Sequence, residues 1–326
     1  MTARRPTILL LLVLLAPLSL AISLGNGSVE IPLTDVLNNL IASNASMQHD
    51  IIWQLRWPRA ASAFAAGGLL ALAGVLMQVL LRNPLADPYI LGTSGGAAVF
   101  ALLAFIIGLG GLWIPASAFV GALLSTLLVF GIAHGRGSWT SQRLLLTGVV
   151  IAFGWGAIIS FLLSVAPQAQ LRGMLYWLMG DLSHAQHGLA GLSVLLVVFI
   201  ACLPLLRGLD ILQRGALQAS ALGLNVQRYE WGLYAFAALC TAIAVSLAGS
   251  VGFVGLVAPH LLRLVFGTSQ HRWLVPGAVL LGGSLLVLAD TLARSLFAPQ
   301  QLPVGVMTAA LGVPLFLFML YRGQQR

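Results

Sequence analysis

The sequence predicts an all-α protein that crosses a membrane about ten times. Hydrophobic residues make up 59% of its 326 positions and charged residues only 7%, whereas a soluble domain carries roughly a quarter charged residues because its surface faces water. The apolar stretches are long and continuous rather than alternating, which favours helices over a β-barrel. Because a backbone in lipid must satisfy its own hydrogen bonds, each stretch is expected to form a helix of about twenty residues.

Ten apolar segments follow one another between turns and polar loops. They are residues 8–24, 58–81, 92–108, 114–133, 143–165, 188–206, 230–247, 249–266, 273–297 and 303–321. Arg4 and Arg5 precede the first segment as they would in a secretory signal peptide, but many spans follow and no small-residue cleavage site precedes Asn26, so we expect a retained helix. Residues 1–326 are therefore predicted to form one transmembrane domain, with no soluble domain or tandem repeat.

The arginines predict that both termini lie in the cytoplasm. With the N-terminus inside, about three-quarters of the arginines fall on the inner side, as the positive-inside rule requires. The outer set is Arg56, Arg59, Arg172 and Arg294. The net charge of +8 does not indicate nucleic-acid binding, because the arginines are dispersed over helix ends instead of clustered in a patch. Contact with membrane lipid explains the composition better.

The sequence contains no lysine, and this excludes a conventional ATPase site within the chain. A P-loop uses the lysine of GxxxxGK[ST] to reach the nucleotide phosphates. Any ATP-driven work, with its ATP and Mg, would therefore have to take place on a partner protein, and this chain is expected to bind no cofactor. It also lacks the HExxH and CxxC patterns, so neither catalytic nor metal-ligating residues are predicted. Cys202 and Cys240 fall in apolar segments, where free thiols usually behave as small hydrophobic residues.

Three separated motifs identify a family resemblance. They are residues 82–98 (RNPLADPYILGTSGGAA), 252–263 (GFVGLVAPHLLR) and 302–314 (LPVGVMTAALGVP). In this order, and with the helix spacing from about residue 50 onward, the chain resembles the permease subunits of ABC importers for cobalamin, haem and ferric siderophores. The resemblance implies a bacterial inner-membrane homodimer that moves a metal chelate by alternating access. It also implies two copies of a cytoplasmic ABC ATPase and a periplasmic substrate-binding protein as partners.

The resemblance places a coupling helix in the inner loop of residues 207–229. This helix would insert into a groove on the ATPase, and the residues assigned to it are Ala219, Ser220, Leu222 and Gly223. They form a compact knob of small residues that Gly223 could cap. The alternative is an ordinary connecting loop. Thr140 and Ser141 lie where the family closes a cytoplasmic gate, although Ser and Thr are also common at helix starts as capping residues.

The outer arginines oppose the positive-inside tendency and so invite a functional explanation. In the family, arginines on this face dock carboxylates of the binding protein, which suggests this role for Arg56, Arg59 and Arg294. Lipid headgroup anchoring or an internal ion pair is the alternative. Asp290 lies one helical turn before Arg294, so a structural Asp290–Arg294 pair is expected. An intramembrane carboxylate could instead relay protons, which would make the chain an ion-coupled secondary transporter.

Further features concern helix packing. Gly92 with Gly96, and the series Gly249, Gly252 and Gly255, are expected to allow close helix contacts. Pro259 is expected to break or kink its helix. Residues 167–187 are predicted to form an outer loop with an interfacial helix. Two residues depart from the family pattern: Gln301 replaces a common glutamate, and Tyr89 replaces a small or aliphatic residue.

Overall fold

The structure is a computed structural model that describes residues 4–27, 29–41, 46–134, 141–183, 185 and 188–323. Seven helical segments are long and apolar enough to cross a membrane. Six of them contain α1 (Arg4–Gly25), α4 (Trp57–Leu80), α6 (Trp113–His134), α7 (Ser141–Val165), α12 (Val226–Ala248) and α14 (His271–Ser295). The seventh, Gly188–Leu212, is α9 (Gly188–Cys202) continued by a 3₁₀ turn and α10 (Leu206–Leu212). Shorter apolar stretches form α5 (Thr93–Ile106), α13 (Val254–Phe266) and residues Val304–Phe318 of α15 (Val304–Gly323). These helices match the ten predicted segments, and the described residues contain no strand.

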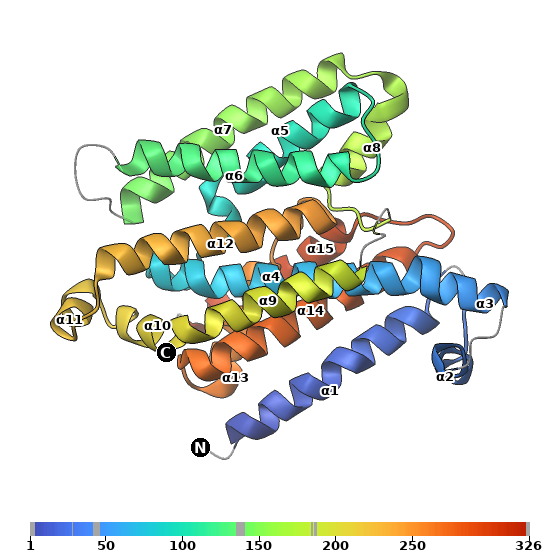
Figure 1. Ribbon diagram of the computed structural model, residues 1–326. Helices are drawn as coiled ribbons and strands as arrows, with labels where there is room; N and C mark the ends of the chain where they lie inside the picture. The colour runs from blue at the N-terminus through green and yellow to red at the C-terminus, as the bar shows by residue number, and fades with distance from the viewer. Residues whose placement is uncertain are drawn as a thin grey trace.

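Helix α4 forms the centre of the larger part of the bundle. It packs against α9, α12, α13 and α14, and Figure 1 shows it running among them. Glycines allow the close contacts: a Cβ on Gly67 would overlap the carbonyl oxygen of Gly282 on α14, and a Cβ on Gly74 would overlap that of Gly255 on α13. The prediction that Gly255 serves close helix packing is confirmed.

Helices α5, α6 and α7 form a second group that lies over α12 together with α8 (Gln168–Leu178) (Figure 1). Gly96 of α5 meets Gly121 of α6 so closely that neither position has room for a side chain. Gly92 has a different role. It follows the 3₁₀ turn Pro88–Leu91 and adopts a φ of 70°, which lets the chain turn before α5 begins. The helix predicted within residues 167–187 is α8.

The helix is not broken at Pro259, where a break was expected. Helix α13 continues through Pro259, and the chain is non-helical before it, where Gly249 and Phe253 have φ values of 68° and 70°. Proline removes the amide that would bond the carbonyl of Gly255. That carbonyl lies against Gly74, so the neighbouring helix covers the position. A Cβ built on Gly252 would have no atom within 4 Å, so Gly252 does not make the close helix contact that was predicted for it.

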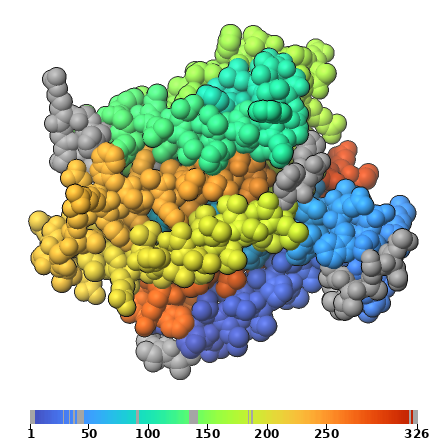
Figure 2. All heavy atoms as spheres, viewed as in Figure 1, coloured from blue at the N-terminus to red at the C-terminus, as the bar shows by residue number. Residues whose placement is uncertain are grey.

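The two ends of the bundle carry different structures. At one end, α10 (Leu206–Leu212) and α11 (Ala216–Ala221) project beyond α12, and α11 protrudes from the molecular surface (Figures 1 and 2). At the other end lie α2 (Leu33–Ile41), α3 (Met47–Asp50) and a π-helical turn, Ile51–Arg56, that leads into α4. We refer to these as the α11 end and the α3 end. Helix α1 begins toward the α11 end.

Candidate functional site

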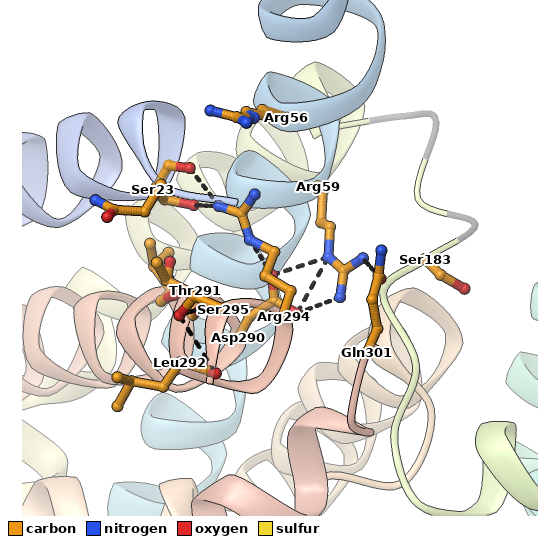
Figure 3. A network of polar contacts seen from close by, with 12 residues as sticks. Ser23, Arg56, Arg59, Ser183, Asp290, Thr291, Leu292, Arg294, Ser295 and Gln301 are labelled. Carbon is orange, nitrogen blue, oxygen red and sulfur yellow. Dashed lines mark hydrogen bonds and ion pairs between the residues drawn. The ribbon is translucent and has the colours of Figure 1, made fainter. Parts of the chain in front are cut away.

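Three of the predicted outer arginines meet at the α3 end, and we call Arg56, Arg59 and Arg294 with Asp290 the arginine cluster (Figure 3). Arg59 makes a two-pronged ion pair with Asp290: its Nε lies 2.9 Å from Oδ2 and its Nη2 lies 2.8 Å from Oδ1. Its remaining nitrogen, Nη1, donates to Gln301 Oε1 at 2.7 Å. Arg59 therefore joins α4, α14 and the segment that precedes α15.

The expected Asp290–Arg294 contact is present, but it is the weaker of two. Arg294 Nε lies 3.7 Å from Asp290 Oδ2, an ion-pair distance that is too long for a hydrogen bond. The closer partner of Asp290 is Arg59, which stands 231 positions away in the sequence. Asp290 is 1% exposed, so it is a buried carboxylate held between two guanidinium groups. Its two cationic neighbours give this carboxylate a structural role in holding α4 to α14.

Arg56 and Arg294 also hold the C-terminus of α1. The last carbonyls of a helix have no partner within it and carry partial negative charge. Arg56 Nη1 donates to the carbonyls of Leu24 at 2.6 Å and Gly25 at 3.1 Å, and Nη2 donates to Val29 O. Arg294 Nη2 donates to Ser23 O and, at 2.8 Å, to Ser23 Oγ. Two guanidinium groups thus cap one helix end.

This burial changes the expectation for docking. Arg56 and Arg294 are each 6% exposed and donate to carbonyl groups of the chain itself. Within the single subunit they are therefore buried structural cations, and their docking role stays a prediction. Arg59 is 12% exposed and reaches the molecular surface at the α3 end, beside Gln301. Docking through Arg59 stays a prediction.

A cavity of about 470 Å³ opens beside the cluster. Its wall is formed by the loop after α1, the π-helical turn, and the segments before α9 and α15. The lining residues are Gly27, Val29, Ile51, Gln54, Leu55, Arg56, Arg59, Ser183, Ala185, Arg294 and Gln301.

The predicted coupling helix at the α11 end is a single short helix between two glycines. Gly215 and Gly223 have φ values of 114° and 82°, a backbone region that suits glycine. Ser220, Leu222 and Gly223 are exposed, whereas Ala219 is fully buried. Ala219 therefore anchors the helix to the bundle and cannot contact a partner, which corrects the assignment of that residue.

Leu217 is the surface residue that the sequence reasoning missed. Its side chain is 90% exposed, and that of Leu222 is 62% exposed. The sequence feature that could have identified Leu217 is its position as an apolar residue inside a polar loop. A second cavity of about 470 Å³ lies beside α11, and Leu217 and Glu230 help to line it. Of the predicted gate residues, Thr140 lies outside the described residues and Ser141 begins α7.

The two departures from the family pattern have local consequences. Gln301 accepts a hydrogen bond from Arg59. The hydroxyl of Tyr89 accepts one from the amide of Val251 at 3.2 Å, in the non-helical stretch between α12 and α13. Sequence reasoning found no role for Tyr89, because its partner lies 162 positions away.

Comparison with known proteins identifies the chain at the level of family. The family model described as the FecCD transport family matches residues 11–322. The chain belongs to this family. It is 39% identical to the hemin transport system permease protein HmuU of Yersinia pestis over 97% of this chain and 95% of that protein. It is 40% identical to the vitamin B12 import system permease protein BtuC of Vibrio cholerae over 85% of each.

A solved structure supports the fold as well as the family. An inward-facing structure of a metal-chelate type ABC transporter aligns with a TM-score of 0.84 and 30% identity, covering 97% of this chain and 99% of that one. The FecCD family member is thus a multi-span permease subunit of an ABC importer, a transport component and not an enzyme, and a separate subunit supplies the ATPase. The comparisons give no support to an ion-coupled secondary transporter.

Proposed function

We propose that this permease imports a large metal chelate of the haem, cobalamin or ferric siderophore class from the periplasm to the cytoplasm. Two relatives that are matched over most of their length are named for hemin and vitamin B12. Both of these ligands are metal-bearing macrocycles too large for a narrow channel. The permease acts as a homodimer in the bacterial inner membrane, with both termini in the cytoplasm, and a periplasmic binding protein delivers the chelate.

The observation that carries this proposal is the form of α11 in a chain without lysine. The helix protrudes from the bundle (Figure 1), and the exposed Leu217 and Leu222 offer an apolar contact surface. Exposed apolar side chains at a projecting surface are typical of contact sites. Two copies of a cytoplasmic ATPase would seat on the α11 helices of the homodimer, and closure on ATP would move them.

The α3 end is the corresponding site for the binding protein. Arg59 stands at the surface beside Gln301 and Tyr176, whose hydroxyl donates to Gln301 O at 3.4 Å. A partner carboxylate that reached this surface would meet a guanidinium already oriented by Asp290. The candidate gate at Thr140 and Ser141 belongs to the same proposal and would close the cytoplasmic side of the path.

Uptake into proteoliposomes tests the function. The permease, its ATPase and its binding protein are reconstituted, and accumulation of labelled haem, cobalamin and ferric siderophores is compared with ATP inside the vesicles. ATP-dependent accumulation of one chelate is expected and identifies the cargo. Accumulation that follows a proton gradient without ATP would contradict the proposal.

Leu217→Asp tests the coupling site. Placing a charge at the centre of an apolar contact typically costs 2 kcal/mol or more, so we expect ATPase binding to weaken at least about thirtyfold. Gln270→Asp, at an exposed position of another loop, is the matched control and should bind normally. Because both positions are exposed, thermal unfolding of the permease alone should not change for either variant. Normal ATPase binding by the Leu217 variant would show that α11 is an ordinary loop.

A further inference from the structure

Helix α11 belongs to a unit that is joined at its base. Helix α10, α11 and the first turn of α12 lie together at the α11 end (Figure 1), and we call these residues, 206–230, the α11 unit. The hydroxyl of Tyr229 on α12 donates to the carbonyl of Leu205 just before α10, and a Cβ on Gly208 of α10 would overlap the Tyr229 ring. Ala219 of α11 is fully buried. A displacement of α11 is therefore expected to move the start of α12 with it.

Side chains of α10 and α12 attach the α11 unit to the rest of the bundle. Asp210 of α10 meets His271, the first residue of α14: its Oδ1 accepts from the His271 backbone amide at 2.9 Å and lies 2.7 Å from His271 Nδ1. Glu230 of α12 meets Arg82, which follows the end of α4, with Oε1 and Nη2 3.6 Å apart. Glu230 also lines the cavity beside α11. The contact of Glu230 with Arg82 therefore joins the surroundings of α11 to the end of the central helix.

Arg82 occupies a backbone position where glycine is usual. Its amide donates to the carbonyl of Val79 at 3.2 Å, and the amide of Asn83 donates to that of Gln78 at 3.1 Å, which is the Schellman arrangement of a helix end. The φ of Arg82 is 49°, in the left-handed region where a residue with a Cβ is strained and glycine is not. Such strain persists where contacts of the surrounding structure compensate it. The contact with Glu230 is one that glycine could not make.

The segment that Arg82 begins leads from the surface into the interior of the bundle. It joins α4 to α5, and its Pro88 is buried against Gly255 of α13, where a Cβ would overlap the proline ring. The hydroxyl of Tyr89 accepts from the amide of Val251 at 3.2 Å. One end of this segment is thus fastened to the α11 unit and the other to α13 and the stretch before it.

We propose that Arg82 and Glu230 are positioning residues that hold the segment between α4 and α5 to the α11 unit, so that movement of the unit is carried into the bundle during transport. The proposal rests on the proposed seating of the ATPase on α11. Arg82 is 45% exposed and Glu230 is 16% exposed, and a part-exposed ion pair contributes little to the stability of a fold. Its place between the α11 unit and a strained helix end assigns the pair to coupling instead.

Arg82→Gly separates coupling from stability. Glycine removes the contact with Glu230 and relieves the left-handed backbone, so we expect an unfolding temperature equal to or above that of the wild type. The permease is reconstituted with its ATPase and binding protein, and labelled haem, cobalamin and ferric siderophore are each offered. We expect the amount of chelate accumulated per ATP hydrolysed to fall at least about twofold. A contact that served stability alone would lower the unfolding temperature and leave this ratio unchanged.

Charge reversal supplies a rescue. Arg82→Glu and Glu230→Arg each bring like charges together and should lower the ratio, whereas the double variant restores an ion pair and should return the ratio to near the wild-type value. Arg272→Gln, at an exposed arginine of α14 at the same end of the bundle, is the control and should leave the ratio unchanged. A wild-type ratio in Arg82→Gly, or a double variant no better than either single variant, would overturn the proposal.

Binding of the ATPase, measured on the same variants, distinguishes this proposal from the one on which it rests. Arg82→Gly leaves the exposed Leu217 and Leu222 in place, so we expect it to bind the ATPase as the wild type does. Normal binding by Leu217→Asp would remove the seating of the ATPase on α11. Weakened binding by Leu217→Asp, together with a wild-type ratio in Arg82→Gly, would leave that seating intact and show that the link through Arg82 and Glu230 is wrong.

Discussion

Helices α4 and α7 have similar length and hydropathy but opposite surroundings. They contain 24 and 25 residues, and their most apolar stretches have mean hydropathies of 2.0 and 2.2. In α4, 94% of that stretch is buried in the protein, against 11% in α7. Seven alanines and three glycines give α4 a smooth surface that neighbouring backbones can approach, whereas α7 has two alanines and three glycines among bulkier residues. Hydropathy places a helix in the membrane, and side-chain size decides whether protein or lipid surrounds it.

The glycines of the two helices show that position matters as well as number. Gly67 and Gly74 of α4 face the backbones of α14 and α13, where a Cβ would overlap a carbonyl oxygen. A Cβ built on Gly154 or Gly156 of α7 would instead lie in open space. The residue type is identical, and the packing partner is what differs.

Gly74→Leu should produce the largest effect. Its side chain would be forced into the backbone of Gly255, which cannot move without separating α4 from α13. We expect the free energy of unfolding to fall by about 4 kcal/mol or more, with little folded protein recovered. Gly154→Leu is the matched control in α7 and should unfold at the wild-type temperature. Equal effects of the two substitutions would remove the distinction between a central and a peripheral helix.

Asp290→Asn should have the next largest effect. The change leaves Arg59 and Arg294 buried without a carboxylate, and the loss of one partner of a buried ion pair typically costs about 3 kcal/mol or more. Thermal unfolding of the purified permease measures it, with the exposed Asp50→Asn as control, expected within about 0.5 kcal/mol of the wild type. Wild-type stability of the Asp290 variant would mean that the cluster does not hold α4 to α14.

Trp155→Phe tests the contact that α7 does make with its neighbours. The Trp155 Nε1 donates to the buried Ser125 Oγ of α6 at 2.8 Å, and we expect its loss to cost about 1 kcal/mol in unfolding experiments. Trp113→Phe, at a side chain that is 65% exposed, should change stability far less. If Trp113→Phe lowers the free energy of unfolding more than Trp155→Phe does, the contact between α6 and α7 does not depend on this hydrogen bond.

Phe153→Ala should have the smallest effect on the isolated subunit. The side chain is 77% exposed on α7, so its removal should change the free energy of unfolding by less than about 0.5 kcal/mol. The same variant sharpens the comparison when the proposed homodimer is measured by native mass spectrometry. Weaker dimerisation would show that this face of α7 meets a second subunit, and unchanged dimerisation is expected for a lipid-facing residue.

The sequence by itself determined the class of the protein and the positions of its helices. Composition and apolar run length predicted the helix ends to within a few residues, because membrane insertion depends on properties that are local along the chain. The absence of lysine excluded a P-loop, because that motif requires a lysine and residue types can be read directly from the sequence. The protruding α11 was also predictable, because glycines and polar residues delimit it within one loop.

Only the tertiary structure decided which residues meet. Local spacing suggested Arg294 as the partner of Asp290, and the stronger contact proved to be Arg59, 231 positions away. Arg56 resembles a free outer arginine in the sequence, yet it caps α1 through carbonyls 31 and 32 positions before it. Ala219 faces inward because of the way α11 packs on the bundle, which the sequence of the loop does not reveal. Helical spacing reports neighbours within one or two turns, whereas these contacts depend on how separate helices pack, and the residue types at either end do not specify that packing.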